Sequence, residues 1–457
     1  MNIETICSVL ANAKKLHFIG IGGISMSSLA MIAIDSGLTV TGSDRAPSEL
    51  CRKLEKAGAK IAYGHAAENV DGADAVVFTA AIKEDNPEMM RAKELGIPLL
   101  KRAEFLGYIM KDYRNRIGVA GMHGKSTTTS MLSQIFMEST VNPTIVSGAE
   151  LGILDVAYRV GGREHFIFEA CEYTDSFLSF LPTVAVVLNI DRDHVDYFLS
   201  MEQTIDSFKR YINLADTAVV NWDDARVRVA CEGYKGNLVK CGFRSEGLDY
   251  AAENISYDKG FGEFDLICHG AMLGHVKLSV PGEHSVLDAL CAAASSHISG
   301  IDFESIRLGL LGFTGAHRRF EKTGTFAGGI DVYDDYAHHP SEIETTLRGA
   351  AKRGYREIWC VFQPHTYSRT AGLFDEFARA FGDVDHVIFA DIYAARETNT
   401  FGVSSEMLAA AVGDKGLYVG DFEAIADYLR KNAQKGDLVI TMGAGDVYKI
   451  GTMLCGE

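Results

Sequence analysis

Residues 118–129 read Gly118-Val-Ala-Gly-Met-His-Gly-Lys-Ser-Thr-Thr-Thr129, a glycine-rich turn that contains Gly124-Lys125-Ser126. The apolar run 117–120 before the turn predicts a short buried strand, and residues 127–136 after it predict a helix. Backbone N–H groups of such a loop surround phosphate oxygens, a lysine reaches the β and γ phosphates, and the following hydroxyl can ligate Mg²⁺. The sequence therefore predicts a triphosphate site in the middle of the chain.

This phosphate-loop match is shorter than the strict pattern Gly-x4-Gly-Lys-Ser/Thr. Val119 occupies the first position of the strict pattern, so the match is Gly121-x-x-Gly124-Lys125-Ser126. A glycine-rich turn capped by Ser and Thr is the structural alternative. The strand and helix predicted on either side favour the phosphate site.

The composition of the chain indicates a cytoplasmic enzyme of several domains. A length of 457 residues suggests about three domains, each large enough to bury its own core. The net charge of −17 argues against a broad surface for nucleic acid or anionic membranes, since both need a basic face. Nine scattered cysteines, never spaced Cys-x2-Cys, indicate neither a disulfide framework nor a cysteine zinc site. The sequence shows no leader-like N-terminus and no long apolar run, so we expect no membrane span.

Apolar strands, turns and helices alternate in three successive segments, which predicts three α/β domains with parallel sheets. The first, 1–111, is Rossmann-like, with strands near 17–21, 38–41, 61–63 and 75–78. The central ATP-binding domain, 112–315, adds strands near 166–170, 184–190 and 218–221, and period-two alternation over 250–280 predicts antiparallel strands beside them. The third, 316–457, is again Rossmann-like, with strands near 330–333, 358–362, 387–390 and 438–441, and helices after residues 340, 370, 404 and 421.

A second glycine-rich turn, Gly20-Ile-Gly22-Gly23-Ile-Ser25-Met26-Ser27, follows the first predicted strand. Glycines there allow close approach to a pyrophosphate, and Asp44 ends the next strand, where an acid commonly meets a ribose. Alone, the turn fits a nicotinamide-dependent oxidoreductase, another pyrophosphate ligand or a structural turn. A redox enzyme needs no separate triphosphate loop, so the two turns together favour an ATP-dependent ligase whose substrate is a nucleotide diphosphate.

Acidic clusters end two predicted strands behind the phosphate loop. One is Glu169-Ala-Cys-Glu172, and the other is Asn189-Ile-Asp-Arg-Asp-His194. Carboxyl ends of parallel strands meet at one edge of a sheet, and Mg²⁺ prefers oxygen ligands. We therefore expect two Mg²⁺ ions held by Ser126, Glu172 and His194 together with phosphate oxygens. A helix cap or a surface ion pair is the alternative for each cluster.

These motifs, taken in register, make the chain resemble the Mur ligase family, and within it the branch that adds L-alanine. The resemblance covers essentially the whole length. It rests on blocks at 17–27, 42–44, 64–65, 118–129, 169–172, 189–194, 281–284, 317–320, 334–340, 362–365 and 443–446.

The resemblance implies an ATP-dependent, ADP-forming ligase that joins L-alanine to the carboxylate of UDP-N-acetylmuramate through an acyl phosphate, in peptidoglycan synthesis. It implies Mg²⁺, with Mn²⁺ able to replace it, small-molecule partners only, and a monomer or homodimer. The implied catalytic residues are Lys125, Glu172, His194, His338 and Arg369. The implied ATP-binding residues are Gly121, Met122, His123, Gly124, Lys125, Ser126, Thr127, His284, Asp288, Arg318, Arg319 and Asp334. The implied UDP-substrate residues are Gly20, Gly22, Gly23, Ser25, Met26, Ser27, Asp44, His65 and Thr79. The implied amino-acid pocket is Tyr336, His338 and Arg369.

The chain departs from the family pattern at a few positions. Cys171 stands where relatives often have Asp, which argues against a metal role there. Ser285 and Asp288 replace asparagines, and an acid at 288 is expected to alter hydrogen bonds to the nucleotide. Thr366 stands where many members have Arg. Two other functions fit the same motifs: a ligase that joins a murein peptide in place of one alanine, and a non-catalytic nucleotide-binding module.

We also expect the third domain to move onto the second before chemistry. The implied nucleotide contacts are divided between these two domains, so neither domain holds a complete site. Closure of the two domains would exclude water from the acyl phosphate and bring the amine within reacting distance.

Overall fold

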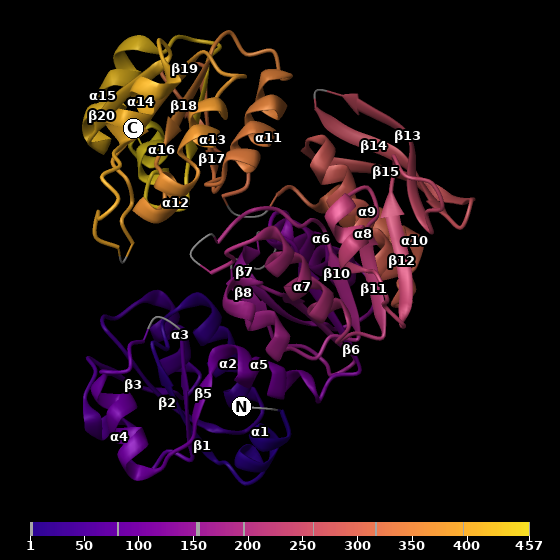
Figure 1. Cartoon of the computed structure of the whole chain (residues 1–457), viewed down its shortest axis with the longest axis vertical. Helices are drawn as coiled ribbons and strands as arrows, with labels where there is room; N and C mark the ends of the chain where they lie inside the picture. The colour runs from indigo at the N-terminus through magenta and orange to yellow at the C-terminus, as the bar shows by residue number, and fades with distance from the viewer. Residues whose placement is uncertain are drawn as a thin grey trace.

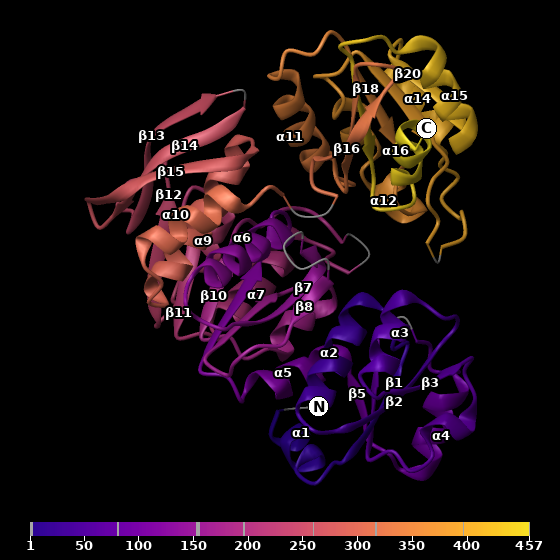
Figure 2. The same ribbon diagram turned by 180° about the vertical axis from the view of Figure 1, so that it is seen from behind.

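The computed structural model describes residues 3–79, 82–151, 156–194, 197–258, 260–315, 318–395 and 397–456. Three bodies follow one another along the chain, each built around its own sheet, with the N-terminus in the first and the C-terminus in the last (Figure 1). The view from behind shows the first and third bodies one below the other on one side of the molecule, with the second body beside them on the other (Figure 2). The predicted α/β fold of three domains is confirmed.

The first domain contains a five-stranded parallel sheet in the order β3-β2-β1-β4-β5. β2 and β4 flank β1 on opposite sides, so a crevice opens at the carboxyl end of β1, where ligands bind in open α/β sheets. The strands are β1 (Lys15–Ile19), β2 (Thr39–Asp44), β3 (Lys60–Tyr63), β4 (Ala75–Phe78) and β5 (Leu99–Lys101). The helices are α1 (Ile3–Leu10), α2 (Ile24–Asp35), α3 (Glu49–Lys56), α4 (Pro87–Leu95) and α5 (Arg102–Met110), with the 3₁₀ turn η1 (Ala67–Val70).

The second domain contains a ten-stranded sheet in the order β15-β14-β13-β12-β11-β10-β6-β9-β7-β8. β14 and β15 run antiparallel at one end, as the alternation over 250–280 predicted. The strands are β6 (Asn115–Ala120), β7 (Thr144–Leu151), β8 (Val156–Arg159), β9 (His165–Glu169), β10 (Val184–Val187), β11 (Thr217–Asn221), β12 (Asn237–Gly242), β13 (Tyr250–Asp258), β14 (Phe261–Cys268) and β15 (Ala271–Pro281). The helices are α6 (Lys125–Glu138), α7 (Met201–Ile212), α8 (Ala225–Ala230), α9 (Glu283–Ile298) and α10 (Phe303–Gly312), with the 3₁₀ segment η2 (Tyr173–Ser179).

The third domain contains a six-stranded sheet in the order β16-β17-β21-β18-β19-β20. β16 pairs antiparallel at the edge, and the other strands are parallel. The strands are β16 (Glu321–Phe326), β17 (Ile330–Asp335), β18 (Ile358–Phe362), β19 (His386–Ala390), β20 (Gly416–Gly420) and β21 (Leu438–Met442). The helices are α11 (Pro340–Ala351), α12 (Tyr367–Gly372), α13 (Phe374–Arg379), α14 (Ser405–Val412), α15 (Phe422–Asn432) and α16 (Tyr448–Cys455).

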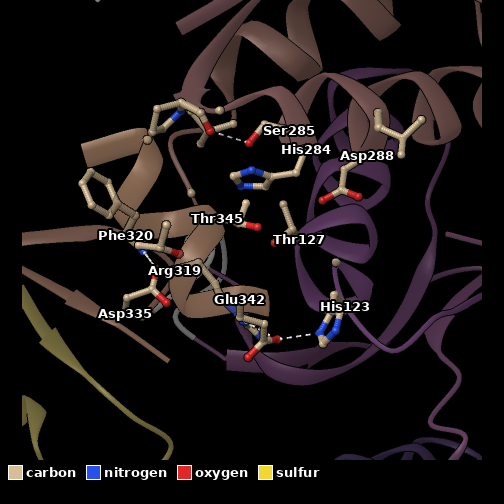
Figure 3. Close-up of a pocket in the computed structure, with 18 of the residues that line it drawn as sticks. His123, Thr127, His284, Ser285, Asp288, Arg319, Phe320, Asp335, Glu342 and Thr345 are labelled. Atoms are coloured by element: carbon tan, nitrogen blue, oxygen red, sulfur yellow. Dashed lines mark hydrogen bonds and ion pairs between the residues drawn. The ribbon is translucent and has the colours of Figure 1, made fainter. Parts of the chain in front are cut away.

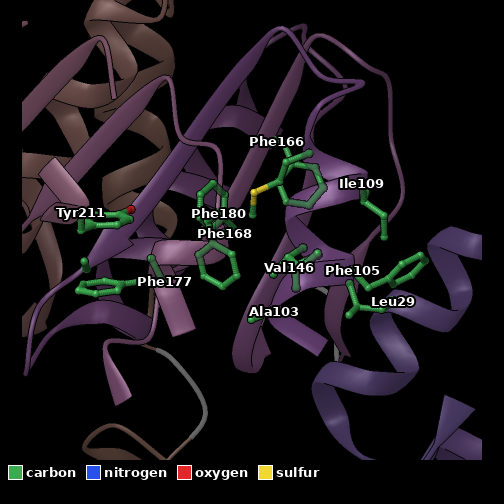
Figure 4. Close-up of a cluster of buried hydrophobic side chains, with 14 of the residues drawn as sticks. Leu29, Ala103, Phe105, Ile109, Val146, Phe166, Phe168, Phe177, Phe180 and Tyr211 are labelled. Carbon is green, nitrogen blue, oxygen red and sulfur yellow. The ribbon is translucent and has the colours of Figure 1, made fainter. Parts of the chain in front are cut away.

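The first two domains share one hydrophobic core. Leu29 of α2 and Phe105 of α5 belong to the same buried cluster as Phe166, Phe168 and aromatic rings of η2 and α7 (Figure 4). The backbones also meet, since a Cβ atom added to Gly107 of α5 would lie 2.1 Å from the carbonyl oxygen of Ser179. The core of the third domain forms separate clusters. Hydrophobic packing therefore joins the first two domains into one unit and leaves the third outside it.

Among the described residues, no helix is both long and apolar enough to cross a membrane. All nine cysteines are free thiols.

Candidate active site

The phosphate loop connects β6 to α6, as the sequence predicted. Gly121 and Gly124 have φ angles of 150° and 82°, a region that favours glycine. A Cβ atom on Gly124 would lie 2.7 Å from a carboxyl oxygen of Asp288, so the position also needs the absence of a side chain. Asn189 accepts from the backbone N–H of His123 at 2.9 Å and donates to its carbonyl oxygen at 3.0 Å. These two hydrogen bonds fix the loop against the end of β10.

Lys125 and His194 both contact the carboxylate of Glu172. Nζ of Lys125 lies 3.0 Å from Oε2 of Glu172, and Nε2 of His194 lies 3.1 Å from Oε1. Glu172 is completely buried. Burial acts to raise its pKa, but the charge of Lys125 and the hydrogen bond with His194 bring the pKa below its ordinary value. Three of the predicted catalytic residues therefore meet at the carboxyl edge of the sheet.

Ser126 contacts a carboxylate that the prediction did not assign to the metal. Its hydroxyl donates to Oε2 of Glu169 at 2.8 Å, and the backbone N–H of Gly148 donates to the same oxygen at 3.2 Å. Glu169 ends β9 beside the loop and adds a carboxylate to the phosphate end of the site. Cys171 follows it, and burial raises the pKa of its thiol to about 11, so the group stays protonated at neutral pH.

A cavity of about 310 Å³ lies between the second and third domains, beside the phosphate loop. Figure 3 shows side chains from both domains pointing into it. The second domain contributes Thr127, His284 and Asp288 to the wall. The third contributes residues from β17, from α11 and from the segment before β16, among them Arg319 and Glu342. The cavity therefore continues from the phosphate loop into the space between the two domains.

Two ionisable side chains in the α9 wall are uncharged at neutral pH. Burial raises the pKa of Asp288 to about 8. Burial, with the nearby charge of Arg319, lowers the pKa of His284 to about 4. A protonated carboxyl offers one donor and one acceptor, as the amide of asparagine also does. The change from Asn to Asp at 288 therefore keeps the hydrogen-bonding pattern, which differs from the alteration expected for a charged acid.

Arg319 and Asp335 line the cavity, whereas the structure places Arg318 and Asp334 away from its wall. Arg318 donates to Oδ2 of Asp334 at 2.6 Å, and Thr441 donates to Oδ1 at 2.6 Å. Asp334 is 1% exposed, so this pair braces the third domain. Adjacent residues of a strand point to opposite faces, which explains why the next aspartate faces the site. Burial raises the pKa of Asp335 to about 6 against the opposing charge of Arg319.

The three residues predicted for the amino-acid pocket gather around His365. The rings of Tyr336 and His338 are 5.4 Å apart, and those of His338 and His365 are 5.9 Å apart. Nη1 of Arg369 lies 3.3 Å from Nδ1 of His365. Burial lowers the pKa of His338 to about 3, so its imidazole is neutral. Arg369 thus places a positive charge near the neutral ring of His338, and the guanidinium groups of Arg318 and Arg319 lie 5.1 and 5.4 Å from the ring centre of Tyr336.

The predicted substrate residues of the first domain lie at the carboxyl ends of its central strands. The backbone N–H of Gly22 donates to Oδ2 of Asp44 at 2.8 Å. A Cβ atom on Gly20 would lie 3.3 Å from the methyl group of Thr79, so the ends of β1 and β4 are in contact. His65 follows β3, and its Nδ1 lies 3.0 Å from Oε2 of the buried Glu88. These residues surround the crevice expected for a pyrophosphate.

The side chains of Met26 and Ser27 in α2 differ from that prediction in their position. Gly23 precedes the helix and is exposed, and Ser25 is partly exposed. Met26 and Ser27 are each 2% exposed, and the Ser27 hydroxyl donates to the carbonyl oxygen of Ile24. Their side chains pack inside the protein because they lie on the inner face of the helix, so these two side chains do not face the crevice.

Comparison with known proteins agrees with the arrangement of three domains. Family models described as "Mur ligase family, catalytic domain", "Mur ligase middle domain" and "Mur ligase, glutamate ligase domain" match residues 15–114, 119–296 and 318–445. The chain belongs to the Mur ligase family. The domain boundaries at 111/112 and 315/316 stay predictions.

Two curated relatives in the Mur ligase family are named UDP-N-acetylmuramate--L-alanine ligase. One, from Acetivibrio thermocellus, is 48% identical over 96% of this chain and 95% of its own length. The other, from Caldanaerobacter subterraneus subsp. tengcongensis, is 46% identical over 97% of each. A solved UDP-N-acetylmuramate-alanine ligase from Thermotoga maritima has a TM-score of 0.80 at 26% identity, covering 96% of this chain and 98% of that one. A murein peptide ligase from Psychrobacter arcticus has a TM-score of 0.71 at 24% identity, over 96% and 98%, and shares the fold.

Several site residues of this Mur ligase were not predicted from its sequence. Glu342 accepts from the side chain of His123 at 3.1 Å, and Asp193 accepts from Arg369 at 3.0 Å. Both contacts join the second domain to the third. The only local signal for Glu342 was its position in the first turn of the helix that begins at Pro340, where acidic residues stabilise the helix N-terminus.

Proposed function

We propose that this chain is an ATP-dependent ligase that joins L-alanine to the carboxylate of UDP-N-acetylmuramate, releasing ADP and phosphate. One observation carries the proposal: a continuous series of contacts runs from the phosphate loop to the amino-acid pocket. Lys125 contacts Glu172 at 3.0 Å, Glu172 contacts His194 at 3.1 Å, and His194 contacts Asp193 at 4.0 Å. Asp193 in turn contacts Arg369 at 3.0 Å. The phosphoryl group and the amine would therefore meet in one place.

The reaction has two bond-forming steps. A carboxylate oxygen of the UDP substrate attacks the γ-phosphorus of ATP, which gives an acyl phosphate and ADP. The amine of L-alanine then attacks the acyl carbon, and phosphate leaves as the amide forms and the nitrogen loses a proton. Two anions approach each other in the first step, so a fixed positive charge at the transferring group stabilises the transition state most. Lys125 supplies that charge; burial acts to lower the pKa of its amine, but the carboxylate of Glu172 raises it, so the amine stays protonated.

The residues around Glu172 fit a divalent cation. Oε2 of Glu172 is buried and accepts no hydrogen bond within the described part of the chain, although Lys125 lies 3.0 Å away. With His194 and the hydroxyl of Ser126, this carboxylate offers the oxygen-rich set that Mg²⁺ or Mn²⁺ takes, and Glu169 adds a further oxygen. Bound there, the cation would neutralise charge on the phosphate oxygens. We propose two such ions, because Glu169 and Glu172 provide two separate carboxylates beside the phosphate loop.

His338 and Arg369 would position L-alanine. Nδ1 of His338 lies 3.0 Å from the carbonyl oxygen of Tyr336, which leaves Nε2 as the acceptor. A ring with so low a pKa is a weak base, so we assign it to hydrogen bonding with the amine and not to proton removal. The Arg369 guanidinium can bind the alanine carboxylate with two parallel hydrogen bonds.

A phosphate-release assay tests the function. With ATP, Mg²⁺ and UDP-N-acetylmuramate, we expect release only when L-alanine is added, in equal amount to the amide product. Release with a murein tripeptide but not with L-alanine would assign the chain to the peptide-adding alternative. ATP binding without any release would assign it to a non-catalytic module. The nine free thiols support action in the cytoplasm, and sedimentation of the purified protein would separate a monomer from a homodimer.

A further inference from the structure

A second group of potential metal ligands lies apart from Glu172 and His194. It consists of His123, Asp191 and His339, whose ligand atoms all lie within 4.8 Å of one another. His123 belongs to the phosphate loop and Asp191 follows β10, so both belong to the second domain. His339 precedes α11 of the third domain. Nε2 of His123 lies 3.7 Å from Oδ2 of Asp191, and the two imidazole rings are 5.0 Å apart.

The outer nitrogen of each imidazole already has an acceptor. Nδ1 of His123 lies 3.1 Å from Oε1 of Glu342, and Nε2 of His339 lies 2.8 Å from the carbonyl oxygen of Arg192. With protons on these outer nitrogens, the lone pairs fall on Nε2 of His123 and Nδ1 of His339, and the latter also accepts from the backbone N–H of Ser341 at 3.4 Å as the N-cap of α11. Histidines that bind metals almost always donate their other N–H to a carboxylate or a carbonyl in this way. The two rings are therefore oriented as a pair of metal ligands would be.

The Ser341 hydroxyl lies between the three ligands. Its oxygen is 3.1 Å from Nε2 of His123, 2.8 Å from Nδ1 of His339 and 3.5 Å from Oδ2 of Asp191. In a tetrahedral zinc site with bonds of about 2.0–2.1 Å, neighbouring ligand atoms are roughly 3.3 Å apart. The 3.7 Å separation of His123 and Asp191 is close to that value, and all three ligand atoms lie within 4.8 Å of one another, so an ion would draw the wider-spaced ligands together and either coordinate or displace the serine oxygen.

We propose that His123, Asp191 and His339 bind one transition-metal ion of the Zn²⁺ class, and that this ion holds the third domain against the phosphate loop. Two imidazole ligands suit zinc, copper, nickel and cobalt better than magnesium, which prefers oxygen ligands. The ligands come from two domains, so the ion stabilises only the arrangement in which these domains are in contact. Product release requires that arrangement to open, so the ion inhibits turnover. The binding part of this inference does not depend on the proposed ligase activity.

A proton competes with the ion at this site. Burial disfavours a charge on His123, but Asp191 and Glu342 raise the pKa of its ring to about 9. Metal binding therefore releases a proton, which weakens the apparent affinity at neutral pH.

Cobalt(II) tests the site directly, because its visible absorption reports four-coordinate nitrogen and oxygen ligation, and a thiolate ligand adds a charge-transfer band. The titration uses the whole protein with saturating Mg²⁺, so that the sites at Glu172 are filled. We expect one ion per chain without a thiolate band, displaced by one equivalent of Zn²⁺. His339→Gln and Asp191→Asn should weaken cobalt binding by at least about tenfold, and Glu342→Gln, which removes the partner of His123, by about 10–100-fold.

His275→Gln is the matched control, because His275 is an exposed histidine paired with Asp265 at 2.8 Å, on the β14–β15 hairpin. It should bind cobalt as the wild type does. Circular dichroism checks that each variant is folded. If His339→Gln does not fold, the cobalt affinity of Glu342→Gln is used to test the site instead. The proposal is overturned if the affinities of the folded variants stay within about twofold of the wild type, or if the bound cobalt shows a thiolate band. Zn²⁺ inhibition of the ligase assay that persists in His339→Gln would overturn the inhibitory role alone.

Discussion

Arg369 of the third domain donates two hydrogen bonds to one oxygen of Asp193 in the second, from Nε at 3.3 Å and from Nη2 at 3.0 Å. Both side chains are almost buried, at 13% and 7% exposure. Burial acts to raise the pKa of Asp193, but the charge of Arg369 brings it below its ordinary value. This pair connects the loop that carries His194 to the helix that carries the predicted carboxylate contact for L-alanine.

Arg369→Lys should raise the KM for L-alanine by at least about tenfold, or roughly 1.4 kcal/mol, because lysine keeps the charge but loses the two parallel hydrogen bonds. The KM for ATP should change little. Steady-state kinetics with each substrate varied in turn measures both values. An unchanged KM for L-alanine would move the carboxylate contact to another residue.

Lys125→Ala should reduce kcat by about 10²–10³-fold, because it removes the lysine charge that the loop offers to the transferring phosphoryl group. It should also lower the free energy of unfolding by about 3 kcal/mol, because it leaves the buried Glu172 without its main charge partner. Urea unfolding measures the second effect. The double variant Lys125→Met with Glu172→Gln should regain stability but not activity, and recovered activity would argue against the assignment.

The lowered pKa of Glu172 determines the pH range in which its ion pair with Lys125 stabilises the protein. A carboxyl whose pKa is lower in the folded state stabilises the protein above its unfolded pKa, near 4.5. The contribution is lost as the pH falls below that value through the folded pKa. The stability of the wild type relative to the double variant should therefore fall on acidification, because the variant has no carboxylate at position 172 to protonate.

Glu172→Gln and His194→Ala should raise the Mg²⁺ concentration needed for half-maximal activity by about tenfold or more, because each removes a ligand. Cys171→Ser should leave it within about twofold, since a protonated thiol is a poor partner for a hard cation. Glu169→Gln tests the carboxylate that contacts Ser126. A larger effect for Cys171→Ser than for Glu172→Gln would reverse the assignment.

Asp288→Asn should leave the KM for ATP almost unchanged at pH 7, because the wild-type carboxyl is protonated there. Above pH 8 the KM of the wild type should rise as the buried acid ionises, while that of the variant stays flat. Between pH 3.8 and about 8 the native state keeps the proton on Asp288, whereas the unfolded chain has already lost it. Wild-type stability therefore falls as the pH rises across that range. The stability of Asp288→Asn relative to wild type should therefore increase from pH 5 to pH 8, and a constant difference would contradict the raised pKa.

The sequence predicted the elements whose signals are local. The strand and helix around Lys125, the antiparallel strands over 250–280 and the helix after Pro340 all depend on short-range patterns. β5, β7, β8, β12, β16 and β20 were not predicted; Gly148 interrupts β7, and β5 and β8 have only three and four residues. Some predicted strand ends differ from the observed ends by a few residues. β10, for example, was predicted to end at Ile190 but ends at Val187.

The site was harder to predict where it depends on the tertiary structure. His123 and Glu342 are 219 residues apart in the chain, and no local pattern indicates that they meet. The choice between Asp334 and Asp335 depends on which face of β17 turns toward the cavity. The protonation of Asp288 depends on how much protein covers it. Each of these properties arises from packing between segments that are distant in sequence.

The core shared by the first two domains has a consequence for synthesis of the protein on the ribosome. The last strand of the first sheet ends at Lys101, but the cluster that covers α2 and α5 continues to Cys231. Domains fold from the N-terminus as they emerge. Here the first sheet still exposes an apolar flank when its own strands are complete, because the second-domain elements that contact α2 and α5, namely β7, β8 and η2, follow later in the chain and end at Ser179. Nascent chains halted shortly after residue 111 should therefore engage chaperones or aggregate, and chains halted after the tunnel has released residue 231 should resist protease.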